Sequence, residues 1–445
     1  MSDPARDAVQ RALERTRRAG ADAADALLID SDALETRVRG EEIEFVKQAR
    51  ERALGIRALV RGDEGFRSAC TSTSDLSPDA VDRMAEQTVA LARATAADPA
   101  AGLPEGGFAE DVADLGLYHP EDREVTVEAR IEDARRAESA AREIDARIDN
   151  SEGSEAGSDF ARVIYSNSAG FYGEYAAATH TLSSTPIARE NGTMQRDYWF
   201  SVSRRLGALD DPATVGRRAA ERALRRLGAR RIPTCEVPVI FDPLTAPSLL
   251  RHLAACVSGS AVYREASFLA GRIGDVVASP LVTVIDDGRR PGGLGSKPFD
   301  GEGLPTRRNV VLERGRLETY LLDSYSARKL GCRSTANAAR SPGSAPSVAP
   351  TNLWLEPGTG TLEELIASTP RGLWVTELIG MGFNPVTGDY SRGAVGLWIE
   401  GGEVAYPVEE ITIAGQLGDM LAAIDAVGSD LLWLGRVASP SLRVA

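Results

Sequence analysis

The side chains that most often carry catalysis or bind metals are sparse in this sequence. Its three histidines are His119, His180 and His252, and no two of them have the i, i+4 spacing of a helical zinc motif. Cys256 follows His252 by four residues, so the two side chains would share one face of a helix. Because no third ligand lies nearby in the sequence, a surface histidine above a buried thiol explains this pair better than a metal site.

A second candidate group lies on one predicted helix. Asp323 has the residue type that begins a helix as its N-cap, and Gly331 has the type that ends one. Ser324, Tyr325 and Lys329 fall on this helix, and a Ser/Lys or Tyr/Lys pair could serve in catalysis. An amphipathic helix with an exposed lysine is the simpler interpretation. The residues alone therefore indicate no self-evident active site.

Composition and charge exclude several classes of function. The chain has 445 residues, 43% of them apolar, and a net charge of −14, which argues against nucleic-acid partners and anionic membrane surfaces. No apolar run approaches the roughly 18 residues of a membrane-spanning helix. The first ten residues contain no apolar signal region. The four cysteines are scattered without a CxxC pair, so we expect free, buried thiols in a cytoplasmic protein.

The pattern of apolar residues predicts an α+β fold. Alternating segments between residues 24 and 71, separated by turn residues, predict a meander of short strands. Helical patterns flank this meander. The segment 229–235 is a plausible boundary, so we predict two domains, residues 1–232 and 233–445, each built from antiparallel strands and packed helices.

Two hairpins, each followed by a helix, dominate the second half. Residues 309–322 form one, and residues 394–414 form the other around Gly401-Gly402, a pair typical of a type I′ turn. Pro407 lacks an N–H, so we expect it to interrupt the return strand. The repeated plan suggests one large antiparallel sheet with packed helices. Two long polar loops, 286–303 and 333–352, interrupt this region, and we expect at least one of them to face a substrate or partner.

Several motifs, in order along the chain, resemble those of the TldD/TldE (PmbA) family. The most specific lie near the C-terminus and read GDYSRG, GLWIE and YPVEEITIAG. Earlier segments agree with them, namely 271–274, 286–288, 300–303 with Thr306, 336–338, 350–353 and 356–358. The resemblance covers most of the chain and is weakest in the N-terminal third.

That family has two arms, and the residues at the metal-motif positions indicate which of them this chain resembles. The TldD arm resembles a zinc metallopeptidase, in which a helical HExxxH motif and a later cysteine bind the metal. In this chain the motif positions fall on Leu250, Arg251 and Ala255, and no cysteine follows Cys332. The resemblance therefore implies the TldE/PmbA arm, with no catalytic residue and no metal site in this chain, and with zinc in a partner subunit.

The function that this resemblance implies is that of a non-catalytic subunit in a heteromeric TldD-type zinc metalloprotease. The assembly, a heterodimer or larger, would cleave unfolded or short peptides, in some organisms to mature a peptide natural product. The peptide would lie extended against a sheet edge. The residues that we expect to face the substrate or partner are Asp389, Tyr390, Arg392, Asn337 and Arg340.

Two other functions stay open at this point. A stand-alone hydrolase with an unrecognised site would use the loop that carries Asp389, Tyr390 and Arg392. A peptide-binding or regulatory scaffold would bind its target with no protease partner. Metal content and peptidase activity of the purified chain separate these functions from the subunit hypothesis.

Overall fold

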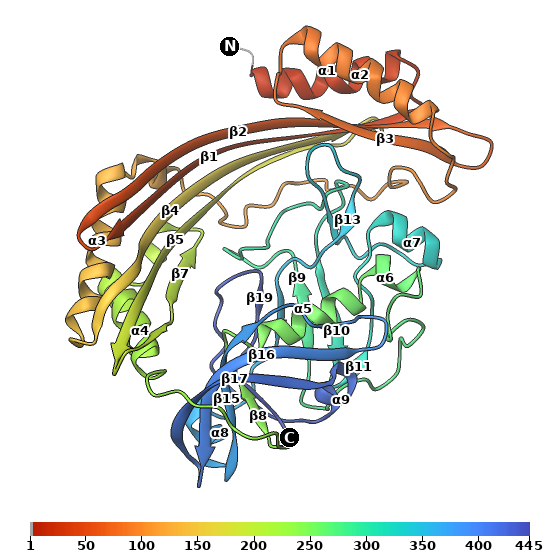
Figure 1. Ribbon diagram of the computed structural model, residues 1–445. Helices are drawn as coiled ribbons and strands as arrows, with labels where there is room; N and C mark the ends of the chain where they lie inside the picture. The colour runs from red at the N-terminus through yellow and green to blue at the C-terminus, as the bar shows by residue number, and fades with distance from the viewer. Residues whose placement is uncertain (1–2) are drawn as a thin grey trace.

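The computed structural model describes residues 3–445 and confirms an α+β fold with large antiparallel sheets and packed helices. A long curved sheet from the N-terminal half arches over the C-terminal half (Figure 1). The elements of the N-terminal half are α1 (Pro4–Arg18), β1 (Ala23–Arg39), β2 (Glu42–Arg61), β3 (Phe66–Thr73), α2 (Pro78–Arg93), the 3-10 helix η1 (Pro120–Glu124), α3 (Val127–Glu143), β4 (Ile148–Asn167), β5 (Tyr172–Glu190), β6 (Thr193–Arg196), β7 (Trp199–Ser203), the 3-10 helix η2 (Leu206–Ala208) and α4 (Pro212–Leu224).

The long sheet is antiparallel, with the strand order β3-β2-β1-β4-β5-β6 and β7 paired to β5. The predicted short strands are wrong here, because β1 and β2 run unbroken for 17 and 20 residues. The turn-like residues 30–32 lie inside β1, where Asp30 pairs with Arg52 on one side and Arg162 on the other. Neighbouring strands on both sides satisfy the backbone of β1, so strand pairing overrides the local preference for a turn.

Two helical pairs cover the ends of this sheet (Figure 1). Near one end, α1 and α2 bury Val9 and Val81 against Leu28 and Ile56. At the other end, α3 and α4 pack against β4 and β5. Each pair covers apolar residues of the sheet and so stabilises the N-terminal half.

The C-terminal half contains three further sheets. Their orders are β11-β10-β9-β14-β19, β12-β13 and β17-β16-β15-β8-β20-β18. The elements are β8 (Val239–Phe241), α5 (Pro247–Cys256), α6 (Gly259–Val262), β9 (Val284–Asp287), β10 (Arg308–Glu313), β11 (Arg316–Leu317), α7 (Ser324–Leu330), β12 (Ala338–Ala339), β13 (Ser347–Val348), β14 (Leu353–Leu355), α8 (Leu362–Ala367), β15 (Arg371–Ile379), β16 (Asp389–Glu400), β17 (Glu403–Gln416), α9 (Leu417–Ala422), β18 (Ile424–Val427), β19 (Val437–Ala438) and β20 (Leu442–Val444).

The two predicted hairpins exist, but the prediction that they share one sheet is wrong. Strand β10 pairs with β9, whereas β16 pairs with β15, so the hairpins belong to separate sheets. The turn at Gly401-Gly402 is confirmed, with φ angles of 63° and 82°. Pro407 does not interrupt β17, because β17 is an edge strand and one of its sides has no neighbouring strand of the sheet.

The halves meet through a buried ion-pair triad and an aromatic cluster. Asp25 of β1 pairs with Arg57 of β2 and with Arg340 from the long loop 333–352. The other long loop, 286–303, places Phe299 among aromatic rings of β4 and β5. Both loops therefore contact the long sheet. Within residues 3–445, no helix is long and apolar enough to cross a membrane.

Candidate functional site

Helix α5 lies in the C-terminal half and divides its side chains between the core and the surface. Leu250 and Leu253 are at most 1% exposed, whereas Arg251 and Ala255 are exposed and His252 is half-buried. Arg251 and Ala255 share a face because they are four residues apart. The face that carries Arg251, His252 and Ala255 is therefore the part of α5 that a ligand or partner could contact.

The donors on α5 do not fit a zinc ion. Leu250 points into the core, Ala255 lies on the exposed side, and neither side chain has an atom that binds metal. Cys256 is fully buried. Within residues 3–445, no three His, Cys, Asp or Glu side chains are grouped as a metal site would require. That Leu250, Arg251 and Ala255 occupy the metal-motif positions of the TldD arm stays a prediction.

The prediction of a loop at Asp389, Tyr390 and Arg392 is wrong, because β17 pairs with this segment and makes it the start of strand β16. The strand places Tyr390 and Arg392 beside α5 and Asp389 away from it. Tyr390 and Arg392 are 2% and 9% exposed and, two residues apart, lie on the same face of the strand. The Nε of Arg392 donates to the carbonyl of Ile379 at 3.3 Å. Asp389 lies on the opposite face, is exposed and accepts from Gln416 at 2.7 Å. The structure therefore separates Asp389 from the other two.

We call Arg251, His252, Tyr390 and Arg392 the α5 cluster. The ring of His252 meets the ring of Tyr390 edge to face, with 5.8 Å between centroids. Its other neighbour is Phe383, whose ring stacks on it at 4.3 Å. The Nε2 of His252 and the hydroxyl of Tyr390 are buried and have no hydrogen-bond partner in the described chain.

The loop between β15 and β16 positions Phe383, a residue that no sequence pattern indicated as functional. Ser391 donates its N–H to the carbonyl of Gly382 at 2.8 Å, which folds the loop back onto β16. A Cβ at Gly382 would lie 1.9 Å from the carbonyl oxygen of Ser391, so this approach requires glycine. The sequence signal that could have indicated Phe383 is an aromatic residue between Gly382 and the turn at Asn384-Pro385.

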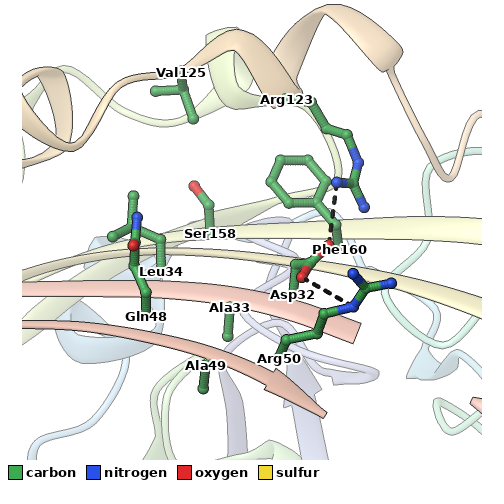
Figure 2. A pocket seen from close by; sticks show the side chains of 10 residues that line it. All are labelled: Asp32, Ala33, Leu34, Gln48, Ala49, Arg50, Arg123, Val125, Ser158 and Phe160. Atoms are coloured by element: carbon green, nitrogen blue, oxygen red, sulfur yellow. Dashed lines mark hydrogen bonds and ion pairs between the residues drawn. The ribbon is translucent and has the colours of Figure 1, made fainter. Parts of the chain in front are cut away.

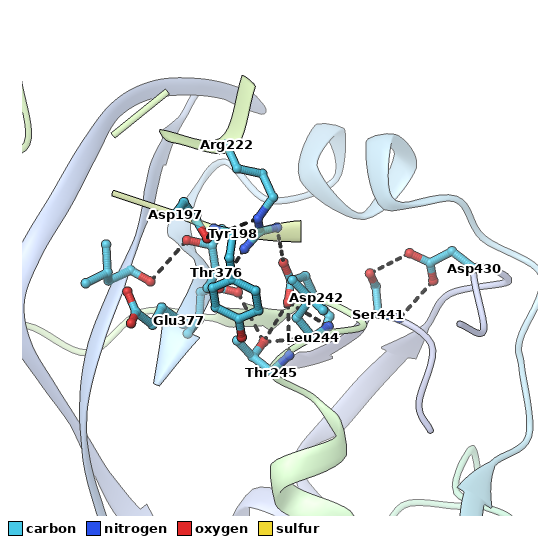
Figure 3. A network of polar contacts seen from close by, with 12 residues as sticks. Asp197, Tyr198, Arg222, Asp242, Leu244, Thr245, Thr376, Glu377, Asp430 and Ser441 are labelled. Carbon is cyan, nitrogen blue, oxygen red and sulfur yellow. Dashed lines mark hydrogen bonds and ion pairs between the residues drawn. The ribbon is translucent and has the colours of Figure 1, made fainter. Parts of the chain in front are cut away.

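A buried polar network fixes the start of α5 (Figure 3). Asp242 accepts from the N–H and the hydroxyl of Thr245, both at 3.0 Å. Arg222 of α4 donates to Asp197 at 3.2 Å and to the carbonyl of Thr376 at 3.2 Å. Its guanidinium also lies 3.8 Å from Asp242. The network joins both halves of the chain and holds α5 in one orientation.

Asn337 and Arg340 make only internal contacts. Asn337 is 0% exposed and donates to Asp286 at 2.7 Å. Burial raises the pKa of Asp286 to about 6. The side chain of Arg340 is also 0% exposed and pairs with Asp25. That these two residues face a substrate or partner stays a prediction, to which this burial lends no support.

The other candidates from the sequence have structural contacts. The predicted caps of α7 are confirmed: Asp323 accepts from the N–H of Ser326 at 2.7 Å, and Gly331 has a φ of 64°. Tyr325 and Lys329 on this helix both donate to Asp98, at 2.6 and 3.0 Å. They therefore tie α7 to the N-terminal half. The four cysteines are free, as predicted, but the prediction that they are buried is wrong for Cys235 and Cys332, which are exposed.

Several hollows in the described chain lie outside the α5 cluster, and two of them bear on function. One, of about 420 Å³ beside β1, β2 and β4, contains Arg50 and Arg123, which both lie near Asp32 (Figure 2). Arg50 also pairs with Asp30 at 3.0 Å, so each of the two arginines has an acidic partner. The second, of about 930 Å³, runs beside residues 410–416 of β17, and we call it the β17 groove. Its apolar lining includes Leu373, Trp398, Ile411 and Ile413.

Comparisons with known proteins agree with this architecture. Models of PmbA/TldA metallopeptidase domain 1, the central domain and the C-terminal domain match residues 24–92, 120–227 and 234–445. The chain is 38% identical over 446 residues to metalloprotease PmbA of Escherichia coli O157:H7, which covers 99% of this chain and 95% of that protein. A metalloprotease TldD homolog of Haemophilus influenzae is 28% identical over 261 residues, 55% of this chain and 53% of that protein.

Solved structures show the same fold. A proposed modulator of DNA gyrase from Bacteroides thetaiotaomicron superposes with a TM-score of 0.91 at 28% identity, covering 100% of this chain and 98% of that one. TldE from Thermococcus kodakarensis superposes with a TM-score of 0.87 at 24% identity, covering 98% of each chain. The second likeness shows the fold alone.

Proposed function

Because the chain belongs to the PmbA/TldD family of metallopeptidases, we propose that it is the non-catalytic subunit of a heteromeric metalloprotease. A TldD-like partner supplies the zinc site, and this chain holds none. The donor set on α5 carries the proposal, because Leu250, Arg251 and Ala255 replace two ligands and a general base with side chains that cannot do that chemistry. We place the assembly in the cytoplasm.

The substrate in this proposal is an unfolded or short peptide. The β17 groove supports it, because apolar and polar side chains both line it and an edge strand borders it. In the described chain, Arg230 forms a bridge to Val408 of β17, and the groove lies beside the later residues 410–416. An extended peptide binds such an edge through main-chain hydrogen bonds, which accept many sequences.

The loop beside the α5 cluster supports contact with a partner subunit. Ile379, Met381 and Val386 are 54%, 87% and 52% exposed, so three apolar side chains within eight residues face solvent in the single chain. Apolar groups gathered in this way are typical of interaction surfaces. The partner that we assign to this surface is the TldD-like subunit.

The first experiment is metal analysis and a peptidase assay of the purified chain, alone and after co-expression with a TldD-like subunit. We expect zinc and hydrolysis only in the co-purified complex. Stoichiometric zinc in the single chain would overturn the proposal. Hydrolysis by the single chain that Asp389→Ala abolishes would establish a stand-alone hydrolase instead. Peptide binding with no complex formed would favour a scaffold.

A substitution tests the surface separately. Met381→Asp places a charge on the exposed apolar loop, so we expect it to weaken complex formation at least tenfold while the chain stays folded. Met194→Asp is the matched control, because Met194 is 60% exposed but lies on β6 of the N-terminal half. Equal retention of the complex by both variants would exclude this surface from the interface.

A further inference from the structure

The α5 cluster holds two positive charges that no acidic side chain balances. Within residues 3–445, no carboxylate lies within 4.0 Å of the guanidinium of Arg251 or Arg392, although the chain has 65 acidic residues and a net charge of −14. The acids on neighbouring elements are engaged elsewhere. Glu377 pairs with Arg226 at 2.7 Å, and Asp389 points away from the cluster.

Two further polar groups of the α5 cluster lack partners. The Nε2 of His252 is buried without a hydrogen bond in the described chain. The hydroxyl of Tyr390, a residue 2% exposed, lies near Ser248 but makes no well-aligned hydrogen bond to it. A buried polar atom without a partner is costly, so a ligand or a water that bonds to it is stabilised. Two such atoms beside two unbalanced charges indicate one binding site.

The protonation states make this site a set of donors. Burial, together with Arg392 and Arg251, lowers the pKa of His252 to about 4, so its ring is neutral at pH 7 and has one N–H to donate. Burial raises the pKa of Tyr390 to about 12, so the phenol keeps its proton. Two guanidiniums, a phenol and an imidazole N–H together match an anion that only accepts hydrogen bonds.

We propose that the α5 cluster binds a carboxylate group of a peptide. The guanidiniums of Arg251 and Arg392 supply the charged donors, and Tyr390 and His252 complete the set. That the anion is a carboxylate of a peptide rests on the proposed function, whereas the recognition of an anion rests on the cluster itself. The carboxylate comes from the C-terminus of the peptide or from an acidic side chain, and the experiment below separates these sources.

The surroundings of the cluster suit this ligand. Ala255 is exposed on the same face of α5 as Arg251 and leaves room there. Phe383 closes the side of His252 with an apolar ring. Arg392 pairs across the strands with Ile413, which lines the β17 groove, so the two side chains lie on the same face of the sheet. The carboxylate site therefore adjoins the groove assigned to the peptide.

Three peptides test the proposal by isothermal titration calorimetry. The first is an N-acetylated Ala/Ser hexapeptide with a free C-terminus, the second is its C-terminal amide, and the third is an amide that contains one glutamate. We expect amidation to weaken binding about tenfold to a hundredfold, since each charged hydrogen bond is lost. Regained affinity of the third peptide identifies an acidic side chain as the source, and its failure identifies the C-terminus.

Variants connect this preference to the cluster. Arg251→Gln and Arg392→Gln should bind the acid and the amide with equal affinity. Arg83→Gln on α2 is the matched control, because Arg83 is also an exposed helical arginine without an ion pair in the described chain, and it should keep the preference. Equal binding of both peptides by the unaltered chain would overturn the proposal, as would a preference that persists in both variants.

A spectroscopic measurement is independent of these variants. The chain has three histidines, so His252→Gln assigns the His252 signal in NMR spectra. A bound carboxylate should raise the pKa of His252, whereas the amide should leave it unchanged. The same titrations are run on the co-purified complex. An active complex without acid preference would refute only this inference, while acid preference in a chain that forms no complex would refute only the proposed function.

Discussion

The buried triad of Asp25, Arg57 and Arg340 yields the sharpest prediction about stability. Asp25 is 0% exposed and accepts from Arg57 at 2.8 and 2.5 Å, and Arg340 pairs with its other oxygen. Asp25→Asn keeps the shape of the side chain but removes its charge. Two buried guanidiniums then lose their counter-charge at the contact between the two halves of the chain.

The size of the effect follows from this burial. Removing one partner of a buried ion pair costs about 3–5 kcal/mol, because the remaining charge stays desolvated. Asp30→Asn is the matched control, since Asp30 lies on the same strand and pairs at 3.0 Å with Arg50, whose side chain is 65% exposed. Exposed pairs contribute at most about 1 kcal/mol. We therefore expect a gap of at least about 2 kcal/mol between the two variants.

Urea denaturation monitored by circular dichroism measures this gap, and its pH dependence adds a second readout. Burial acts to raise the pKa of Asp25, but Arg340 and Arg57 outweigh it, so this pKa lies below its ordinary value. A lowered carboxyl pKa stabilises the fold above the unfolded-state pKa of about 3.9, and the stabilisation is lost only as pH falls through the folded-state pKa. The deficit of Asp25→Asn should therefore persist from pH 7 to about pH 4 and shrink below it. An Asp25→Asn variant no less stable than Asp30→Asn would refute the reasoning.

Three further predictions concern single side chains. Burial and the charge of Asp300 raise the pKa of Glu302 to about 7, so the folded state keeps a proton that the unfolded state loses above pH 4.5. Stability should therefore fall as pH rises from 4.5 to 7. In urea titrations the free energy of unfolding of Glu302→Gln should be higher than that of the parent by up to about 3 kcal/mol at pH 8, but equal to it at pH 4.5. A difference that does not change with pH would contradict this. Gly216→Ala would place a Cβ 2.0 Å from the carbonyl oxygen of Ala137, so pushing α4 from α3 should cost about 1–3 kcal/mol in denaturant midpoint analysis, and an unchanged midpoint would exclude this close packing. Gly402→Ala forces alanine to a φ of 82°, so thermal unfolding should show a loss of about 1–2 kcal/mol, and a neutral result would mean that the turn relaxes freely.

Local signals in the sequence predicted the features that depend on a few neighbouring residues. Helix α7 begins after Asp323 and ends at Gly331, as predicted, because a side-chain cap and a left-handed glycine act within one helical turn. The turn at Gly401-Gly402 formed where expected for the same reason, since both positions need positive φ. The α+β class followed from the sum of such signals.

Strand length and sheet membership could not be predicted in this way. Residues 30–32 have turn-like types, yet β2 and β4 pair with them from both sides and keep β1 extended. The two hairpins of the C-terminal half look alike in sequence, but each joins a different sheet through its neighbour, β9 or β15. Such pairing depends on segments far apart in the chain, which no local pattern encodes.

In the α5 cluster, too, some features follow from local sequence and others depend on contacts between distant segments. By itself the sequence determined that Arg251 and His252 are adjacent on a helix, because this relation follows from backbone periodicity. It predicted a loop at Tyr390 and Arg392, and only the pairing of this segment with β17 makes it part of strand β16. Only the tertiary structure decided that β16 packs beside α5, that Phe383 covers His252, and that Asn337 and Arg340 are buried. Burial and the absence of a counter-charge set the protonation states and the hydrogen-bonding capacity of the α5 cluster. Both arise only when distant segments pack together.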